Sequence, residues 1–214
     1  MSDVFPKWTN SLPRKLALAA LVVSAGAVSA IGYYFTPKYT QSAYQPIQPV
    51  AFSHKTHCAQ LEMDCRYCHN GVEKSASANL PATSTCLNCH GQVLQDDLRL
   101  DSVRLSASTG LPIPWVRIQK LPDYTYFNHA VHTQRGVGCV DCHGRVDQVD
   151  EVKMTPMSMA NCLDCHRNPA RSIRPLDKIT QMDWPGTNST SVDAASMAKS
   201  LQIQPRESCS ACHR

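Results

Sequence analysis

Large aromatic side chains and charged residues are scarce in this chain. Of its 214 residues, 7% are aromatic, with four Phe and three Trp, and 18% are charged. So few large apolar side chains cannot easily fill a core of the usual size. The hydrophobic share of 43% is nevertheless too high for an intrinsically disordered chain. The net charge of +4 comes without long runs of Lys or Arg, so nothing indicates a nucleic-acid-binding protein.

The alternation of apolar and polar residues that is typical of β-strands is also lacking, so we expect no sheet. Cysteine and histidine, in contrast, are abundant, with 11 Cys and 9 His. Eleven cysteines are fewer than a small disulfide scaffold of this length needs, and an odd number cannot all be paired with one another. The spacing of the cysteines therefore has to indicate their role.

Ten of the cysteines form five C-x-x-C-H motifs, a spacing typical of covalent haem attachment. The two thiols of such a motif form thioether bonds to the haem vinyl groups, and the following His ligates the iron from the proximal side. The motifs are Cys65/Cys68/His69, Cys86/Cys89/His90, Cys139/Cys142/His143, Cys162/Cys165/His166 and Cys209/Cys212/His213. The sequence therefore predicts five covalently bound haem c groups.

Zinc binding is the main alternative, because the first and second motifs, and the third and fourth, have the spacing of zinc ribbons. Three features argue against it. A His follows every second Cys, the fifth motif has no partner motif, and the cysteine-bearing part follows an export segment. The remaining cysteine, Cys58, completes no motif, and we interpret it as a free or minor structural thiol.

An internal repeat organises the chain into two modules. Phe52-Ser53-His54-Lys55-Thr56-His57 recurs 75 residues later as Phe127-Asn128-His129-Ala130-Val131-His132, and each copy precedes two C-x-x-C-H motifs. Two homologous two-haem modules are the simplest explanation. We place the first module with its connector at 52–126, and the second module with the fifth haem at 127–214.

The histidines outside the motifs are candidates for distal iron ligands. Residues three apart share a helix face, so each His-x-x-His pair can present two imidazoles to two haems. The candidates are His54, His57, His129 and His132. One of the five irons then lacks a distal His, and Met is the usual substitute. We favour Met159, with Met157 next, and expect that haem to have a higher potential than the other four.

Near the N-terminus, residues 16–35 carry no charge, proline or amide side chain and are long enough to span a bilayer as a helix. Lys7, Arg14 and Lys15 precede this run, which predicts a cytoplasmic N-terminus (1–15) and a periplasmic remainder. Half of the run is small residues, which suit packing against other membrane helices. A cleaved signal peptide is the alternative, with Val28-Ser29-Ala30 as its cleavage site.

Between the membrane segment and the first module, Pro37, Pro46 and Pro49 predict an extended tether over 36–51. Short helices are expected over 92–105 and 192–201. The predicted fold is thus a multihaem cytochrome c, mostly coil with short α-helices wrapped around five haems, plus one N-terminal transmembrane helix.

In these features the chain resembles the pentahaem c-type cytochrome subunit of bacterial alternative complex III, a multihaem class III-like cytochrome. The resemblance covers nearly the whole chain. The matching stretches are Phe52-Ser53-His54-Lys55, Pro114-Trp115-Val116-Arg117, Leu121-Pro122-Asp123, Phe127-Asn128-His129, Gly136-Val137-Gly138-Cys139, Cys142-His143-Gly144-Arg145-Val146-Asp147, Cys162-Leu163-Asp164-Cys165-His166-Arg167 and Cys209-Ser210-Ala211-Cys212-His213-Arg214.

The resemblance implies a role in a respiratory complex of the bacterial inner membrane. Other membrane and iron–sulfur subunits oxidise quinol there, and the pentahaem subunit relays the electrons to a monohaem cytochrome c or a terminal oxidase. The chain itself then has no catalytic residue. Two alternatives remain. One is a membrane-anchored quinol dehydrogenase that feeds a periplasmic reductase, and the other is a haem enzyme with an open iron site.

Whole-protein mass spectrometry tests the prediction on which the others depend. The native protein should carry the added mass of five porphyrins, because each C-x-x-C-H motif attaches one covalently. A mass without any added porphyrin would refute the interpretation of the motifs.

Overall fold

The structure is a computed structural model that describes residues 6–36, 44–185 and 193–213. The chain divides into two compact units, 1–42 and 43–214. In the first, helix α1 (Leu12–Tyr34) begins with Pro13 in its first turn, four residues before the predicted run. It is long and apolar enough to cross a membrane, a property that membrane anchors and signal sequences share. Residues 37–43 of the predicted tether lie outside the described residues.

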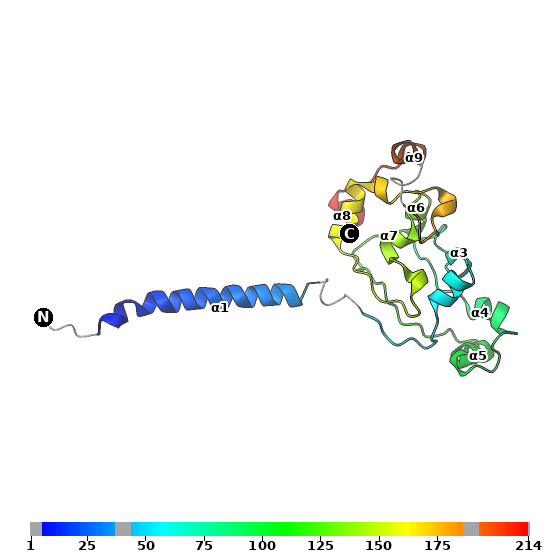
Figure 1. The fold of residues 1–214 in the computed structure, drawn as a ribbon, viewed down its shortest axis with the longest axis horizontal. Helices are drawn as coiled ribbons and strands as arrows, with labels where there is room; N and C mark the ends of the chain where they lie inside the picture. Colours follow the sequence, from blue (N-terminus) through cyan, green and yellow to red (C-terminus); the bar gives the residue numbers. More distant parts are fainter. Residues whose placement is uncertain (1–5, 37–43, 186–192, 214) are drawn as a thin grey trace. The chain divides into compact units, whose positions relative to one another are not determined.

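The second unit consists of short helices joined by irregular segments (Figure 1). Its α-helices are α3 (Cys65–Cys68), α4 (Thr83–His90), α5 (Asp101–Thr109), α6 (His129–Thr133), α7 (Cys139–His143), α8 (Met159–Arg167), α9 (Ala194–Ser200) and α10 (Cys209–Cys212). The π-helix η2 (Lys55–Gln60) and the 3-10 helices η3 (Leu98–Leu100), η4 (Val146–Gln148), η5 (Pro169–Arg171) and η6 (Leu176–Lys178) accompany them, and η1 (Lys7–Asn10) precedes α1. Within the described residues β-pairing is limited to two isolated bridges.

Two helices expected between the motifs have different outcomes. Helix α9 lies inside the predicted range 192–201 and begins after Asp193, whose carboxylate accepts from the backbone N–H groups of Ala195 and Ser196. The helix expected over 92–105 starts later. Leu94 has a φ of +57°, which interrupts a helix at that point, and the helical residues are those of η3 and α5.

The two modules exchange backbone hydrogen bonds with each other. The first His-x-x-His segment donates to a loop of the second module, from His54 to Asp150 at 3.3 Å and from Lys55 to Val149 at 3.0 Å. The second segment donates to the equivalent loop of the first module. Those bonds run from His129 to Ala76 at 3.3 Å and from Ala130 to Ser75 at 3.1 Å. The repeat therefore forms a reciprocal pair, in which each module holds the other's histidine segment.

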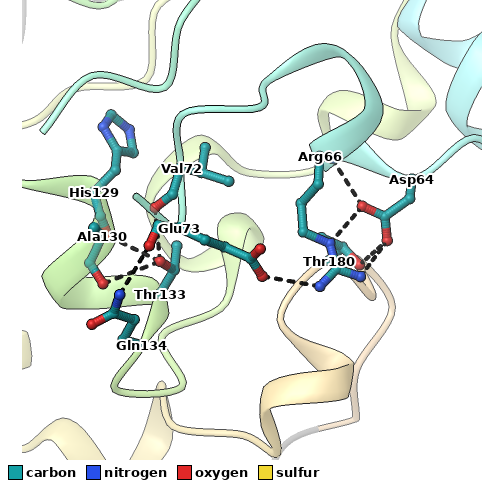
Figure 2. A network of polar contacts seen from close by, with 9 residues as sticks. All are labelled: Asp64, Arg66, Val72, Glu73, His129, Ala130, Thr133, Gln134 and Thr180. Carbon is teal, nitrogen blue, oxygen red and sulfur yellow. Dashed lines mark hydrogen bonds and ion pairs between the residues drawn. The ribbon is translucent and has the colours of Figure 1, made fainter. Parts of the chain in front are cut away.

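Side chains reinforce this exchange (Figure 2). The Thr133 hydroxyl of α6 donates to the Val72 carbonyl at 2.8 Å, and the Gln134 amide donates to the Glu73 carbonyl at 2.9 Å. Arg66 next bridges Glu73 and Asp64. Thr133 is buried, so its hydrogen bond is shielded from competing water.

The predicted tether is not free of the second unit. Gln48 exchanges two side-chain hydrogen bonds with the backbone of Val116, at 2.9 and 3.0 Å. Val50 is buried in a cluster with Val103 and Ile113, against which Trp115 packs. Residues 44–51 are therefore attached to the connector between the modules.

A stretch that we call the central segment, residues 172–182, contains three of the most deeply buried residues of the described chain. Ile173 and Ile179 are 1% and 2% exposed, and Arg174 is 2% exposed. The segment touches both modules, because the Thr180 hydroxyl donates to Asp64 at 2.9 Å and the Ile179 carbonyl accepts from the Cys139 N–H at 3.0 Å. It thus holds the start of the first motif close to the start of the third.

Gly136 lets the central segment pack closely against the backbone before the third motif. Its φ of +75° is a backbone conformation that residues with a Cβ adopt only at a cost in free energy. A Cβ at this position would also overlap the Arg174 carbonyl oxygen. We expect Gly136→Ala to lower the free energy of unfolding of the full chain in detergent by about 1–3 kcal/mol through overpacking, beyond the cost of the backbone conformation. Denaturant titration followed by circular dichroism measures the loss.

Gly110→Ala is the matched control. Gly110 has a similar φ of +73°, but a Cβ there meets no neighbouring atom. Its cost should be only the conformational one, about 1 kcal/mol. Equal losses in the two variants would show that the central segment is not tightly packed at Gly136.

Candidate haem centres

All five C-x-x-C-H motifs lie on short helical turns. The two cysteines of each motif are three residues apart on α3, α4, α7, α8 or α10, so they project from the same side of the turn. All eleven cysteines have free thiols. In this arrangement both sulfurs of a motif could form thioether bonds to the vinyl groups of one haem.

The ten motif cysteines differ in how far the protein encloses them. Cys89, Cys162 and Cys209 are exposed, whereas the other seven are partly buried. The turns α4, α8 and α10 each present one side to solvent. Attachment of haem at the ten motif cysteines remains a prediction from motif spacing.

Histidines from distant parts of the sequence face the motif histidines. The ring centroids of His57 and His90 are 6.1 Å apart, with an angle of 62° between their planes. Those of His132 and His166 are 6.2 Å apart at 45°, and those of His129 and His143 are 6.4 Å apart at 3°. His54 lies close enough to His69 for the His69 ring to contribute to the lowered pKa of His54. Four distal candidates thus lie near four different motif histidines.

These separations fit an iron between the rings. A metal–imidazole bond is about 2 Å long and the ligating nitrogen lies about 1 Å from the ring centre, so two axial imidazoles have centroids about 6 Å apart. A direct hydrogen bond between two rings would need a shorter separation. The three pairs therefore have the spacing of axial ligands of a haem.

Hydrogen bonds orient most of the imidazoles. In six histidines Nδ1 lies 2.8–3.2 Å from a backbone carbonyl, which can only accept, so Nδ1 carries the proton. Nε2 then keeps its lone pair for a metal, the usual arrangement of ligating histidines. The six are His57, His69, His90, His129, His132 and His166. Nδ1 of His54 is buried and lacks a hydrogen-bond partner among the described residues.

Burial lowers the pKa of three candidate ligands and so favours their neutral form. It lowers the pKa of His54 to about 4, with smaller contributions from His69 and His57. Burial likewise lowers the pKa of His143 to about 4, with help from His129 and His69, and it lowers the pKa of His132. A neutral imidazole is the form that can donate electrons to iron.

Two phenylalanines hold the histidine pairs, a role that the repeat did not reveal. The Phe52 ring lies edge-on to His54 at 4.8 Å and stacks on His57 at 4.3 Å. The Phe127 ring repeats both contacts with His129 and His132, each at 4.7 Å. The shared first position of each F-x-H-x-x-H segment thus fixes the angle between two imidazoles.

The fifth motif has different surroundings. The Tyr124 ring lies 5.8 Å from the His213 ring, and the Tyr126 N–H donates to the Cys212 carbonyl at 2.8 Å. Met159, the predicted tenth ligand, begins α8 and is 61% exposed, whereas Met154 is buried. Ligation by Met159 or Met157 remains a prediction.

Contacts between motifs give their spatial order. The Asn88 amide of the second motif donates to the Tyr67 hydroxyl of the first at 3.0 Å. The third and fourth motifs share α6, which carries the facing histidines of both. The fourth motif contacts the segment that precedes the fifth motif, since His166 Nδ1 donates to the Arg206 carbonyl at 2.8 Å.

The first and third motifs meet at the middle of the series. The pKa of Cys139 is raised, first by a hydrogen bond with the Cys65 thiol and then by burial. The spatial order of the motifs is therefore second, first, third, fourth, fifth. Figure 1 shows α4, α3, α7 and α8 following one another in that order.

The remaining observations also suit a large apolar cofactor better than zinc. The described residues include eight buried hydrophobic ones, a small core for this length of chain. Among the same residues, no group of three or more His, Cys, Asp or Glu is arranged so that it could hold a metal ion. Burial raises the pKa of the leftover thiol, Cys58, to about 11.

Comparisons with known proteins agree with this chemistry. A family model described as cytochrome c552 matches residues 106–204. The menaquinone reductase, multiheme cytochrome c subunit, of Nitratidesulfovibrio vulgaris is 36% identical over 115 residues, 52% of this chain and 52% of that protein. A cytochrome c-552 of Maridesulfovibrio salexigens is 23% identical over 199 residues, 70% of this chain and 40% of that protein.

A shorter match is to a cytochrome c-552 of Desulfotalea psychrophila, which is 34% identical over 61 residues, 25% of this chain and 12% of that protein. The chain spans about half, or less, of the length of these curated relatives. Together with the attachment motifs, the similarities support a multihaem c-type cytochrome with covalently bound haem c.

Proposed function

We propose that this chain is a membrane-anchored pentahaem cytochrome c that relays electrons within a quinone-linked respiratory complex of the alternative complex III type. The observation that carries the proposal is the facing of two imidazoles, 6.1–6.4 Å apart, at three of the five attachment motifs, the second, third and fourth. Haem supplies a one-electron Fe³⁺/Fe²⁺ couple when it is bound at each motif. The chain provides ligands, orientation and an apolar surrounding, and it makes and breaks no substrate bonds.

The facing rings support three of the proposed ligand sets, and the proximity of His54 to His69 supports a fourth. His69, His90, His143 and His166 ligate from the proximal side, opposite His54, His57, His129 and His132 in that order. His213 serves the fifth iron, with Met159 as the favoured partner. Each F-x-H-x-x-H segment thereby serves two neighbouring centres, which fixes the spacing between them.

The spatial order of the motifs gives the relay two ends, the second and the fifth motif. The first and third motifs form its middle, where the modules meet. We assign entry and exit of electrons to the two ends of this series. An iron with a thioether ligand at the fifth motif has a raised potential, which suits an exit toward a monohaem cytochrome c or a terminal oxidase.

Helix α1 is proposed as a retained single-pass anchor in the bacterial inner membrane, with the haem-bearing unit on the periplasmic side. Lys7, Arg14 and Lys15 before the span support that orientation. The small residues of α1 suit close packing against membrane subunits of the complex, and iron–sulfur subunits are further proposed partners.

A second candidate function reverses the direction of electron flow. A relative that is 36% identical over 115 residues carries the name of a menaquinone reductase subunit. In that case electrons enter from a periplasmic donor and leave toward menaquinone through the membrane partners. The same relay serves both directions, because the ligand geometry does not depend on the sign of the driving force.

Substitution of one distal histidine tests the ligand sets. In His129→Ala, one of the five haems should lose its low-spin signal, because His143 alone then ligates that iron. Electron paramagnetic resonance measures the loss of one low-spin component, and that component identifies the third haem. The reduced variant should also bind carbon monoxide at one haem.

Val131→Ala, on the same helix and 55% exposed, is the control and should leave all five signals unchanged. If His129→Ala retained every low-spin signal, the proposed pairing of His129 with His143 would be wrong.

Purification through this chain in mild detergent tests the complex. We expect membrane and iron–sulfur subunits to co-purify, and the complex to reduce the haems when menaquinol is added. The isolated chain should not be reduced by menaquinol, since it lacks a quinol site of its own. Direct reduction of the isolated chain would favour the quinol dehydrogenase alternative, whereas reduction of menaquinone by the pre-reduced complex would favour the second candidate.

A further inference from the structure

Arg174 of the central segment is a buried cation at the middle of the proposed relay. Its side chain is 3% exposed and forms an ion pair with Asp141, the residue before the second cysteine of the third motif. One terminal nitrogen, Nη1, donates to the Gln181 carbonyl at 3.1 Å. Nε is buried and has no acceptor among the described residues. A guanidinium stays charged at all relevant pH values, so this positive charge is permanent.

The backbone beside the third motif is built to admit this guanidinium. A Cβ on Gly138, the residue before Cys139, would overlap the guanidinium carbon of Arg174. The Arg174 N–H donates to the Gly136 carbonyl at 2.8 Å, which holds the central segment against the same stretch of backbone. The charge is therefore fixed next to the attachment turn α7.

The fourth motif carries the same pair in an exposed form. Asp164 also precedes the second cysteine of its motif, and it forms an ion pair with Arg171. The side chains there are 51% and 65% exposed, whereas Asp141 is 24% exposed. Solvent screens the Arg171 charge but has little access to the Arg174 charge. The chain thus contains an internal comparison between a buried and a solvated arginine at equivalent motif positions.

We infer that Arg174 sets the reduction potential of the haem attached at Cys139 and Cys142, raising it through its buried positive charge. This inference rests on the proposed haem binding at that motif. A fixed cation disfavours the oxidised iron, which carries one more positive charge than the reduced iron, and the effect is strong where water is excluded. Asp141 opposes the effect in part, because its carboxylate is closer to solvent than the guanidinium.

Substitutions of opposite sign test the inference in the detergent-solubilised holoprotein. Potentiometric titration followed by electron paramagnetic resonance should show a fall in the potential of the third haem in Arg174→Gln. The potential should rise in Asp141→Asn, which leaves the cation uncompensated. Arg174→Lys keeps the charge and should restore most of the wild-type value. The component absent in His129→Ala identifies the third haem.

Arg171→Gln is the matched control and should leave all five potentials unchanged. Opposite shifts in Arg174→Gln and Asp141→Asn support the inference, since a merely structural role would not produce opposite signs. Unchanged potentials, or shifts in the same direction, would overturn it. If Arg174→Gln does not fold, Arg174→Met, which removes the charge and keeps an apolar stem, decides: a fall in the potential of the third haem supports the inference and its absence refutes it.

Mass spectrometry of the wild-type protein separates this inference from the proposed function. Fewer than five porphyrins, with the third motif unmodified, would refute the proposed haem content. Five porphyrins with no response of the third potential would refute only the role of Arg174.

Discussion

The facing of two imidazoles across about 6 Å is the constraint on which the rest of this structure depends. Such a gap has to be held from both sides, because neither ring touches the other. Backbone carbonyls fix the proton on Nδ1 of six histidines, and Phe52 and Phe127 fix the relative angles of the distal pairs. The short helices and long irregular segments follow from this requirement, since they bring ligands from distant parts of the chain to one point.

The repeat provides the support as a reciprocal pair of modules. Each His-x-x-His segment donates backbone hydrogen bonds to a loop of the other module, so neither histidine pair is held by its own module alone. The central segment then lies across both, with Thr180 bonded to Asp64 and Ile179 bonded to Cys139. The same packing buries Arg174, and a charge shielded from water acts more strongly on its surroundings than a solvated one. The stretch of chain that supports the third motif thus also carries the charge that we propose acts on its haem.

Much of the chemistry could be predicted from residue types and spacing. The C-x-x-C-H motifs, the repeat and the four distal histidines are local patterns, and the structure brings three of those histidines into facing pairs with motif histidines. Helix α9 was also predictable, because Asp193 caps it. The predicted start of the helix over 92–105 was wrong, because Leu94 has a positive φ, which interrupts a helix, and α5 begins only at Asp101. The attachment of residues 44–51 was not foreseen, because the bonds of Gln48 and the burial of Val50 depend on partners far away in sequence.

By itself the sequence determined the positions of the candidate residues: five C-x-x-C-H motifs, two His-x-x-His pairs in matched positions and an apolar N-terminal run of spanning length. Those assignments need only covalent geometry and helical periodicity, which act over a few residues. Only the tertiary structure decided which histidine faces which motif and in what order the motifs adjoin. It also decided that Cys89 is exposed while Cys86 is partly buried, and that Arg174 is buried while Arg171 is solvated. Contacts between residues remote in sequence set these features, because burial and facing geometry depend on how the whole chain closes around its centres.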